Sequence, residues 1–311
     1  MKQRITVQIP ATSANLGPGF DVLGVALHHF NEVTFEAHGS GWSHHRIHFP
    51  LSIRIEGEGQ DTLPRNDSNL VLKSALKVFK RVKRWPKSLD VRMVNRIPLS
   101  RGLGSSAAAV LGGLSAANAL LHKPLSDQDI LEMAVRMEGH ADNVVPAMVG
   151  GFCVSGLIDQ RVRYLKFPAP ANLHAVIYSP ARPLATSQSR RVLPRRVPFT
   201  AAVFTSSRVA FLIGAILQRQ YDLLGFAMED ILHQPTRSHL VPELNDVIQA
   251  ARKAGAWGAA LSGAGSSIIA LTPPGTVARR VANAMKHAFR VRRLESRFLD
   301  LALDNTGIRI R

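Results

Sequence analysis

The chain has 311 residues, of which 46% are hydrophobic, and a formal net charge of +17 at pH 7. This length and hydrophobic content suffice for one large domain or two medium ones and exclude wholesale disorder. The single cysteine, Cys153, excludes an internal disulfide framework and lies in an apolar run typical of a buried, unreactive thiol. The sequence has no uninterrupted apolar run of 18 residues and no signal-peptide core, which predicts a cytoplasmic protein with no membrane partner.

The positive charge could attract either nucleic acid or anionic metabolites such as ATP. The basic residues gather in three short clusters, at 77–87, 190–196 and 279–293. Two of these clusters lie on amphipathic helix patterns, which is typical of solvated helix faces. Aromatic residues make up only 6% of the chain and no nucleic-acid motif accompanies the clusters. We therefore expect a basic surface and no nucleic-acid partner.

The N-terminal part alternates strand patterns with one polar loop. Residues 5–9 alternate polar and apolar side chains and predict a strand. Residues 10–21 are dense in Gly, Pro, Asn and Ser and predict a long loop. Further strands are predicted at 22–27, 31–37 and 47–56. Because long loops inside compact domains are often functional, 10–21 is a candidate binding segment.

Three predicted elements surround the most informative stretch of the chain. Asp67 or Ser68 can cap a helix that runs to about residue 83. An apolar run at 89–94 predicts a strand, and a pattern of small residues at 105–121 predicts a helix. Small side chains permit close approach to a sheet, so we expect this helix to be central and buried. Ser126 then opens a capping-box pattern and a helix to about residue 138.

The rest of the chain shows a mixed α and β pattern without internal repeats or low-complexity linkers. Strands are predicted at 152–155, 162–167, 173–179, 258–261, 268–272 and 298–303. Helices are predicted at 199–218, 220–232, 243–254 and 276–290. A weak break in composition at 168–183 could separate two lobes.

A strand, a glycine-rich loop and a helix start follow one another in a way typical of phosphate binding. The candidate nucleotide-binding stretch is Pro98, Leu99, Ser100, Arg101, Gly102, Leu103, Gly104, Ser105, Ser106, Ala107 and Ala108. Glycines let the backbone approach an anion, and the unpaired N–H groups and dipole of the helix start attract it. The hydroxyls of two serines can bond phosphate oxygens or ligate magnesium.

Three interpretations compete with a kinase-type nucleotide loop on this stretch. The Walker P-loop requires lysine after its last glycine, but Ser105 follows Gly104. Residues 102–107 match the glycine pattern of the dinucleotide-binding fingerprint. That fingerprint also requires an acidic residue about twenty positions further along the chain, after a second strand. Residues 122–127 open a helix there instead. A glycine turn that only packs a helix on a sheet is the third alternative.

Three blocks in order resemble the GHMP kinase family. The stretch 98–108 is similar to its nucleotide loop, 10–21 to its substrate loop and 261–267 (Leu-Ser-Gly-Ala-Gly-Ser-Ser) to its C-terminal glycine loop. The resemblance spans most of the chain. It implies an α+β, two-lobed fold, with a ribosomal-protein-S5-like nucleotide-binding lobe at 1–168 and a ferredoxin-like lobe at 169–311. The site would lie in the cleft between them.

Two blocks narrow the resemblance to the members that phosphorylate homoserine. They are Pro-Ala-Thr-Ser-Ala-Asn-Leu-Gly-x-Gly-Phe-Asp at 10–21 and Glu-Gly-His-x-Asp-Asn-Val-x-Pro-Ala at 138–147. The Gly-Glu-His signature of galactose-specific members and the lysine of mevalonate-specific members are absent from the first block. Ala141 stands where bacterial members commonly carry proline, a departure that removes no functional group. The implied pathway is threonine biosynthesis.

The resemblance implies transfer of the γ-phosphoryl group of ATP to a substrate hydroxyl, which depends on positioning and charge neutralisation. It makes Ser106 and Glu138 the Mg²⁺ ligands. For zwitterionic L-homoserine it assigns Asp21 to the ammonium group, and Arg190 and Arg237 to the carboxylate. The remaining substrate-binding candidates are Asn15, His140, Asn143 and Thr186. Arg191 is the alternative to Arg190 if the register is off by one.

The catalytic candidates are Asp142 and Asn143. Asn143 could bond the δ-hydroxyl, and Asp142 is either the base or a structural cap of its loop. Two other functions stay open: a GHMP kinase with a mevalonate- or shikimate-type substrate, and a basic nucleic-acid-binding protein on an S5-like lobe. A homodimer is a further possibility that the resemblance raises.

Overall fold

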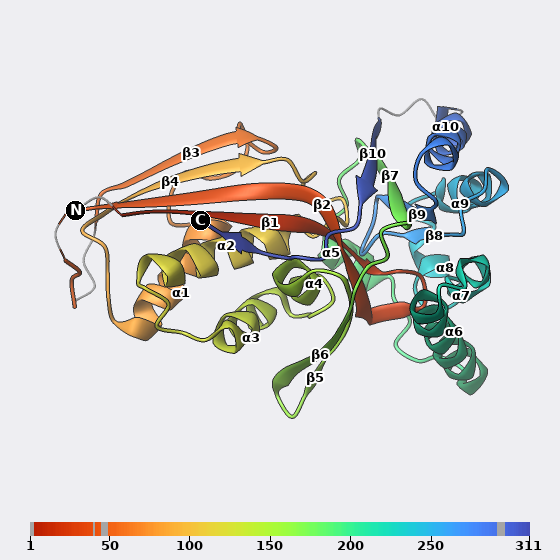
Figure 1. Ribbon diagram of the computed structural model, residues 1–311, viewed down its shortest axis with the longest axis horizontal. Coiled ribbons are helices and arrows are strands. Elements are labelled where there is room, and N and C mark those ends of the chain that lie inside the picture. Colours follow the sequence, from red (N-terminus) through yellow and green to blue (C-terminus); the bar gives the residue numbers. More distant parts are fainter. Residues whose placement is uncertain (1–2, 40, 45–48, 291–295) are drawn as a thin grey trace.

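The computed structural model describes residues 3–39, 41–44, 49–290 and 296–311, and it contains two β-sheets placed end to end along the long axis (Figure 1). The first sheet has seven strands, in the order β11-β1-β2-β4-β3, with β5 paired to β2 and β6 paired to β5. Among its described strand pairs, β3 with β4 is parallel and the others are antiparallel. The strands are β1 (Gln3–Asn15), β2 (Gly19–His38), β3 (Leu51–Gly57), β4 (Ser88–Asn95), β5 (Phe152–Ile158), β6 (Arg161–Phe167) and β11 (Arg309–Ile310).

Four helices cover one face of this sheet: α1 (Leu70–Val82), α2 (Ser105–Leu120), α3 (Asp127–Glu138) and α4 (Val144–Val149). Thirteen of the 16 residues of α2 are buried, and its neighbours are β1, β2, α1 and α3. A Cβ on Gly112 would lie 2.8 Å from the Val33 side chain. The prediction of a central, buried, small-residue helix is therefore confirmed, because larger side chains would push the helix off the sheet.

The second sheet has four antiparallel strands in the order β10-β7-β9-β8. They are β7 (His174–Pro180), β8 (Gly258–Leu261), β9 (Ile268–Thr272) and β10 (Ser296–Ala302). Helices α9 (Leu244–Lys253) and α10 (Thr276–Arg290) pack on it and close a second core around Tyr178. Between the strands lie α5 (Thr186–Arg191), α6 (Phe199–Gln218), the 3₁₀ turn η1 (Tyr221–Leu223), α7 (Leu224–Ala227) and α8 (Gln234–Arg237).

The predicted loop at 10–21 is wrong, because these residues form a β-hairpin. β1 continues to Asn15, a turn occupies 16–18, and β2 starts at Gly19. Pro10 fits because the register shifts between it and Ala11, and a bulge tolerates a residue without an N–H donor. The two predicted strands that follow are likewise one continuous strand, β2. A candidate binding segment is thus held on a sheet rather than on a mobile loop.

Other differences arise where the chain is capped or interrupted. Asn69, rather than Asp67 or Ser68, caps α1 by accepting from the backbone N–H of Val71. The helix predicted at 220–232 is broken into η1 and α7, because the Asp230 carboxylate accepts three backbone N–H groups at the start of α8. The sequence did not predict α4, α5, α8 or β11. The first residues of the strand predicted at 47–56, 47 and 48, lie outside the described residues.

The division into lobes at 168/169 stays a prediction. The first sheet takes its strands from 3–167 and from 309–310, and the second from 174–302. The chain therefore returns to the first sheet at its C-terminal end, where β11 pairs with β1. The backbone of Arg311 also bonds with Thr6.

By length and composition α6 could cross a membrane, and among the described residues it is the one such helix. The expectation of no membrane-length segment missed it, because serine, threonine and Arg208 interrupt its apolar residues. One such helix is weak support for a span, since core helices pass the same test. Here only 22% of the apolar window is buried.

The single thiol of the chain is buried, so we expect it to react slowly with thiol reagents. Cys153 on β5 is 2% exposed, and burial raises the pKa of its thiol to about 12. Since the thiolate is the reactive form, we expect the native protein to react with a thiol reagent at pH 8 at least ~10³-fold more slowly than the unfolded chain. The rate of thionitrobenzoate release with and without denaturant measures this. Equal rates would contradict the buried position.

Candidate active site

A cavity of about 320 Å³ lies where the two sheets meet, and the glycine stretch forms its floor. Its walls come from the β1–β2 hairpin, the α3–α4 connection, α5, α8 and the glycine loop after β8. Every site residue predicted from the sequence lines it except Pro98 and Ala108, which are buried. Arg191 is exposed and does not line the cavity, so Arg190 is the arginine of the pair that faces it.

The glycine loop turns its carbonyl groups away from the cavity. The carbonyl of Arg101 accepts from the N–H of Ser267, and that of Gly102 from the hydroxyl of Ser262. At Gly102 the backbone φ is +73°, and a Cβ would lie 2.0 Å from the Ser262 carbonyl oxygen. At Gly104 φ is +71°, and a Cβ would lie 2.0 Å from a side-chain oxygen of the β1 strand. Both positions therefore require glycine.

The N-terminus of α2 lacks the side-chain cap that α1 and α3 both have. Its N-cap residue is Gly104, which has no side chain to accept a hydrogen bond. The first backbone bond of the helix runs from Ala108 to Gly104, so the N–H groups of Ser105, Ser106 and Ala107 find no acceptor within the described part of the chain. Free backbone donors together with a helix dipole are the features with which helix N-termini bind phosphate oxygens, so this end could hold them.

Ser106 and Glu138 meet at this end of the cavity. The Ser106 hydroxyl donates to the Glu138 carboxylate at 2.7 Å, although the two residues lie on different helices. Burial raises the pKa of Glu138, and the hydrogen bond from Ser106 opposes that shift. A partly buried carboxylate beside a hydroxyl is a donor set that suits Mg²⁺, whose charge would offset the cost of burial.

A hydrogen-bonded chain connects the α3–α4 connection to the hairpin. The ring nitrogen Nδ1 of His140 lies 2.6 Å from the Asp142 carboxylate, which is 3% exposed. The Asn143 amide donates to the same oxygen at 3.4 Å and accepts from the Thr12 hydroxyl at 2.8 Å. Burial lowers the pKa of His140, but the hydrogen bond and charge of Asp142 outweigh it, and the net shift is upward. The pair thus favours imidazolium beside carboxylate.

Asp21 and Arg190 form a two-pronged ion pair across the other end of the cavity. The guanidinium nitrogens lie 2.6 and 2.9 Å from the two carboxylate oxygens, and the residues are 169 positions apart in the chain. The bond to Asp21 raises the pKa of Arg190. Both side chains remain about one-third exposed, so a ligand can reach each charge.

Arg237 on α8 lies beside this pair and is 2% exposed. It donates to the carbonyl oxygens of Ser189 and Gly263, at 3.3 and 3.0 Å. Its Nη1 also lies 3.2 Å from Nδ1 of His233, whose Nε2 contacts the Gly17 carbonyl. Burial lowers the pKa of Arg237 to about 10, so it stays charged at neutral pH. One guanidinium thereby joins α5, α8 and the second glycine loop.

That second glycine loop ties the two sheets together at the site. The Asn15 amide donates to the carbonyl of Gly263, whose own N–H donates to Ala14. Ser13 and Ser262 share a hydrogen bond of 2.8 Å between their hydroxyls. Hydrogen bonds therefore join the loop after β8 to both the β1–β2 hairpin and the glycine loop at 98–108.

Two residues that hold cavity residues in place were not predicted. Thr12 bonds Asn143 and lies inside the motif at 10–21, and His233 contacts Arg237 and opens the segment that carries it, so motif context could have suggested both. A further group lines the end of the cavity near α1 and β4 without any sequence signal: Asn31, Leu63, Pro64, Asn69, Leu70, Met93 and Asn95. These residues come together only because α1 packs beside β4.

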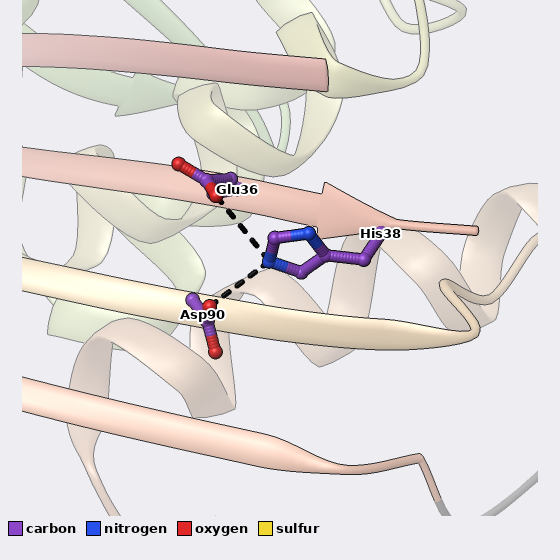
Figure 2. Close-up of side chains that lie close together, drawn as sticks. All are labelled: Glu36, His38 and Asp90. Carbon is purple, nitrogen blue, oxygen red and sulfur yellow. Dashed lines mark hydrogen bonds and ion pairs between the residues drawn. The ribbon is translucent and has the colours of Figure 1, made fainter. Parts of the chain in front are cut away.

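A separate cluster lies on the first sheet, outside the lining of this cavity (Figure 2). Nε2 of His38 lies 2.9 Å from Asp90 and 3.4 Å from Glu36. Glu36 on β2 stands opposite Asp90 on β4 in the strand register, and His38 bridges the two carboxylates. Like charges in this position repel, and the imidazole reduces that repulsion when protonated. We therefore interpret these three residues as an ion-pair network on the surface of the sheet.

The family models that match this chain describe GHMP kinases, and two of its curated relatives are homoserine kinases. The family description "GHMP kinases N terminal domain" matches residues 69–151, and "GHMP kinases C terminal" matches residues 212–291. A homoserine kinase of Carboxydothermus hydrogenoformans is 45% identical over 285 residues, covering 92% of this chain and 90% of that protein. A homoserine kinase of Caldanaerobacter subterraneus subsp. tengcongensis is 40% identical over 306 residues, covering 98% and 95%.

A solved structure is similar over the whole chain. The crystal structure of homoserine kinase from Cytophaga hutchinsonii superposes with a TM-score of 0.89 at 32% sequence identity. The match covers 100% of this chain and 98% of that one.

Proposed function

The chain belongs to the GHMP kinase family, and from this membership we propose that it transfers the γ-phosphoryl group of ATP to the side-chain hydroxyl of L-homoserine. The product is O-phospho-L-homoserine, an intermediate of threonine biosynthesis. Membership in the family confirms the predicted α+β, two-lobed kinase fold with an S5-like and a ferredoxin-like lobe. The proposed compartment is the cytoplasm, where both small-molecule substrates are available.

The observation that carries the choice of substrate is the Asp21–Arg190 ion pair. It places one anion and one cation side by side, within reach of solvent, across the cavity from the nucleotide loop. An amino acid carries the complementary pair of charges on one carbon atom. We propose that its ammonium group binds Asp21 and that its carboxylate binds Arg190 and Arg237. When the substrate binds, Asp21 exchanges the Arg190 guanidinium for the ammonium group of the substrate. Arg190 exchanges the Asp21 carboxylate for the carboxylate of the substrate.

The other substrate contacts follow from the walls of the cavity. Asn15, His140 and Thr186 line the same end and would orient the amino acid between the charged groups. Asn143, held by Thr12, would bond the hydroxyl that receives the phosphoryl group. A sugar or a mevalonate-type acid lacks the ammonium group, so it would leave Asp21 unpaired by substrate.

The nucleotide would bind over the glycine loop. The unpaired N–H groups of Ser105, Ser106 and Ala107 would hold phosphate oxygens, and the apolar and amide residues near α1 would surround the base. Ser106 and Glu138 would hold Mg²⁺, which supplies charge neutralisation at the phosphates when bound.

Asp142 is the proposed acceptor of the hydroxyl proton. As the hydroxyl oxygen bonds to the γ-phosphorus, the bond from phosphorus to the bridging oxygen of ADP breaks, and the proton leaves the new ester. A carboxylate is a weak base, and the bond to His140 holds that of Asp142 in place. A weak base suffices for a loose transition state, in which the nucleophile loses its proton late. The same bond fixes the α3–α4 connection, so the residue also has the structural role.

A coupled ADP-release assay tests the function directly. We expect turnover with L-homoserine and at least ~100-fold lower kcat/KM with mevalonate, shikimate and galactose, because each lacks the ammonium–carboxylate pair that the site complements. Equal turnover with one of these would move the enzyme to another GHMP specificity. Absence of ADP release with all four substrates, together with salt-dependent RNA binding, would contradict the kinase proposal.

A further inference from the structure

The glycine loop at 98–108 is held in shape by residues that follow β7 in the chain. Three consecutive carbonyl groups of the loop accept hydrogen bonds from that part of the protein. The pairs are Ser100 with the N–H of Leu184 at 2.8 Å, Arg101 with the N–H of Ser267 at 3.1 Å, and Gly102 with the hydroxyl of Ser262 at 2.7 Å. Because a trans peptide unit is planar, each carbonyl fixed on this side turns the next N–H to the opposite side. The second half of the chain thereby fixes the direction of the N–H donors of the loop.

Ser100 has the most demanding backbone conformation among the residues of this loop that carry a side chain. Its φ is +54°, in the left-handed region that such residues rarely adopt, and it lines the cavity. A conformation of this kind persists only where the surroundings determine it. The Ser100 carbonyl is bonded to Leu184, and the guanidinium of the next residue, Arg101, donates to the Ala181 carbonyl at 2.7 Å. The loop therefore depends at this point on a segment that is distant in the sequence.

That segment is the stretch 181–185 between β7 and α5, which we call the connecting segment. Besides its bonds to the glycine loop at 98–108, it is bonded to the glycine loop after β8, because the Ser266 hydroxyl donates to the Arg182 carbonyl at 2.6 Å. Leu184 is 7% exposed and belongs to the second core. The connecting segment is thus bonded to both glycine loops of the site.

A buried ion pair anchors the connecting segment to the start of α9. Nη2 of Arg182 lies 2.8 Å from the Glu243 carboxylate, and the Glu243 side chain is 1% exposed. In the described part of the chain, Nε of Arg182 and Oε2 of Glu243 have no hydrogen-bond partner. A buried ion pair often stabilises a protein no more than apolar residues of similar volume would. Stability alone therefore does not account for this pair, but the pair does fix where Arg182 lies.

We propose that Arg182 and Glu243 are positioning residues for the nucleotide, an inference that rests on the ATP site proposed above. Neither residue lines the cavity, so neither is placed to touch the phosphates. Glu243 holds Arg182, and the connecting segment holds the Ser100 carbonyl. That carbonyl in turn sets the direction of the N–H groups that follow it. Loosening the ion pair should therefore weaken nucleotide binding without removing any group that contacts the nucleotide.

The amino-acid end of the cavity has separate anchors. Although α5 follows the connecting segment, the Ser189 hydroxyl on α5 donates to the Ala264 carbonyl at 2.7 Å, and the Ser189 carbonyl accepts from Arg237. Arg190 is held by Asp21. A looser connecting segment should therefore disturb the bound nucleotide much more than the bound amino acid.

The exchange Glu243→Gln separates positioning from simple charge attraction. The two side chains are nearly the same in shape, but an amide oxygen binds a guanidinium more weakly than a carboxylate does, so the connecting segment should loosen. The exchange also removes one negative charge, which by itself would strengthen the attraction for an anionic nucleotide. Positioning therefore predicts weaker nucleotide binding, whereas charge alone predicts tighter binding.

Calorimetric titration of the full chain with Mg²⁺ and ADP, in the absence of homoserine, tests the proposal. We expect the dissociation constant of ADP to rise ~10-fold in Glu243→Gln and in Arg182→Met, because misdirected donors bind phosphate less well. The double variant should bind ADP no more weakly than either single variant, because the two residues act as one unit. Arg182→Lys keeps a cation beside Glu243 and should bind ADP within about threefold of the wild type.

Steady-state kinetics and a stability control complete the comparison. The KM for ATP should rise ~10-fold in Glu243→Gln, while the KM for homoserine should stay within about twofold of the wild-type value. Val247 on α9 is 0% exposed in the same core. Val247→Ala should therefore lower the melting temperature and leave the dissociation constant of ADP unchanged.

Amide hydrogen exchange measures the bond from Leu184 to Ser100 directly. In Glu243→Gln the Leu184 N–H should exchange at least ~10-fold faster than in Val247→Ala, because the ion pair that holds its segment is weakened. Equal exchange in the two variants would mean that the ion pair does not hold the connecting segment.

A Glu243→Gln protein that binds ADP as tightly as the wild type, or more tightly, would overturn the positioning role and leave the proposed kinase activity standing. An equal rise in both KM values would show a general structural role and would overturn the proposal as well. Should Glu243→Gln fail to fold, Arg182→Met and Arg182→Lys decide the question, since the Arg182 side chain is about one-third exposed. A wild-type chain that binds no ADP at millimolar concentration would instead contradict the nucleotide site, and with it the proposed function.

Discussion

Replacing Glu138 by alanine is expected to lower kcat/KM by about 10²–10³-fold at every magnesium concentration. The carboxylate lies 2.7 Å from the Ser106 hydroxyl, at the uncapped N-terminus of α2. Because it is the anionic member of the proposed ligand pair, its removal takes away most of the attraction for the cation. Excess Mg²⁺ cannot replace a missing ligand. The loss corresponds to about 3–4 kcal/mol of transition-state stabilisation.

The control for this experiment lies on the same helix. Glu132 is about 1.7 turns earlier on α3. It pairs with Arg136 and does not line the cavity. Glu132→Ala should therefore keep nearly full activity. Steady-state rates of both variants over a wide range of magnesium concentrations make the comparison. Near-normal turnover of Glu138→Ala at saturating magnesium would remove Glu138 from the proposed metal site.

Replacing Arg237 by alanine is expected to raise the KM for homoserine about 10–100-fold and to leave the KM for ATP nearly unchanged. A hydrogen bond to a charged group contributes about 1.5–3 kcal/mol, which corresponds to this range. The structure adds a second expectation, because Arg237 also holds the carbonyls of Ser189 and Gly263. Its loss takes a donor from each carbonyl and leaves the Gly263 oxygen with the Asn15 amide alone, so the variant should also melt at a lower temperature.

Two companion variants separate these effects. Arg237→Lys keeps the charge but loses the fork, so it should recover stability more than it recovers KM. Arg191→Ala removes an exposed arginine that does not line the cavity, and it should change neither quantity. Kinetics with each substrate varied in turn, together with thermal melts, give the readout. Unchanged homoserine kinetics in a folded Arg237→Ala protein would exclude this arginine from the carboxylate site.

The elements predicted best are those whose signal lies within their own sequence. The bounds of α6, α10, β8 and β9 agree with prediction, because apolar periodicity and flanking glycine or proline define them locally. The hairpin at 10–21 was missed, since its composition is that of a loop. It is extended only because β1 and β2 pair with each other and β2 also pairs with β4 and β5. Pairing between strands is a property of neighbours, which a single segment does not contain.

The candidate site divides in the same way. Resemblance to a family supplied the list of site residues one by one, and the structure places all of them except Pro98 and Ala108 around one cavity. The partnerships within the set could not be read from the chain. Asp21 bonds Arg190 from 169 residues away, and Asn143 bonds Thr12 from 131. The residues around the base end of the cavity carry no motif, because they only need to present suitable surfaces.

The sequence by itself predicted the exposed backbone N–H groups on which the proposed phosphate site at 98–108 depends. A strand, two glycines and a helix start suffice to expose backbone N–H groups. Tertiary structure alone decided that Arg190 rather than Arg191 faces the cavity, and that Glu138 reaches Ser106. Those outcomes depend on which side of α5 packs against the second glycine loop, where Ser189 bonds Ala264, and on how α3 lies beside α2. Local backbone geometry is encoded in adjacent residues, whereas the meeting of side chains is set by the packing of the whole core.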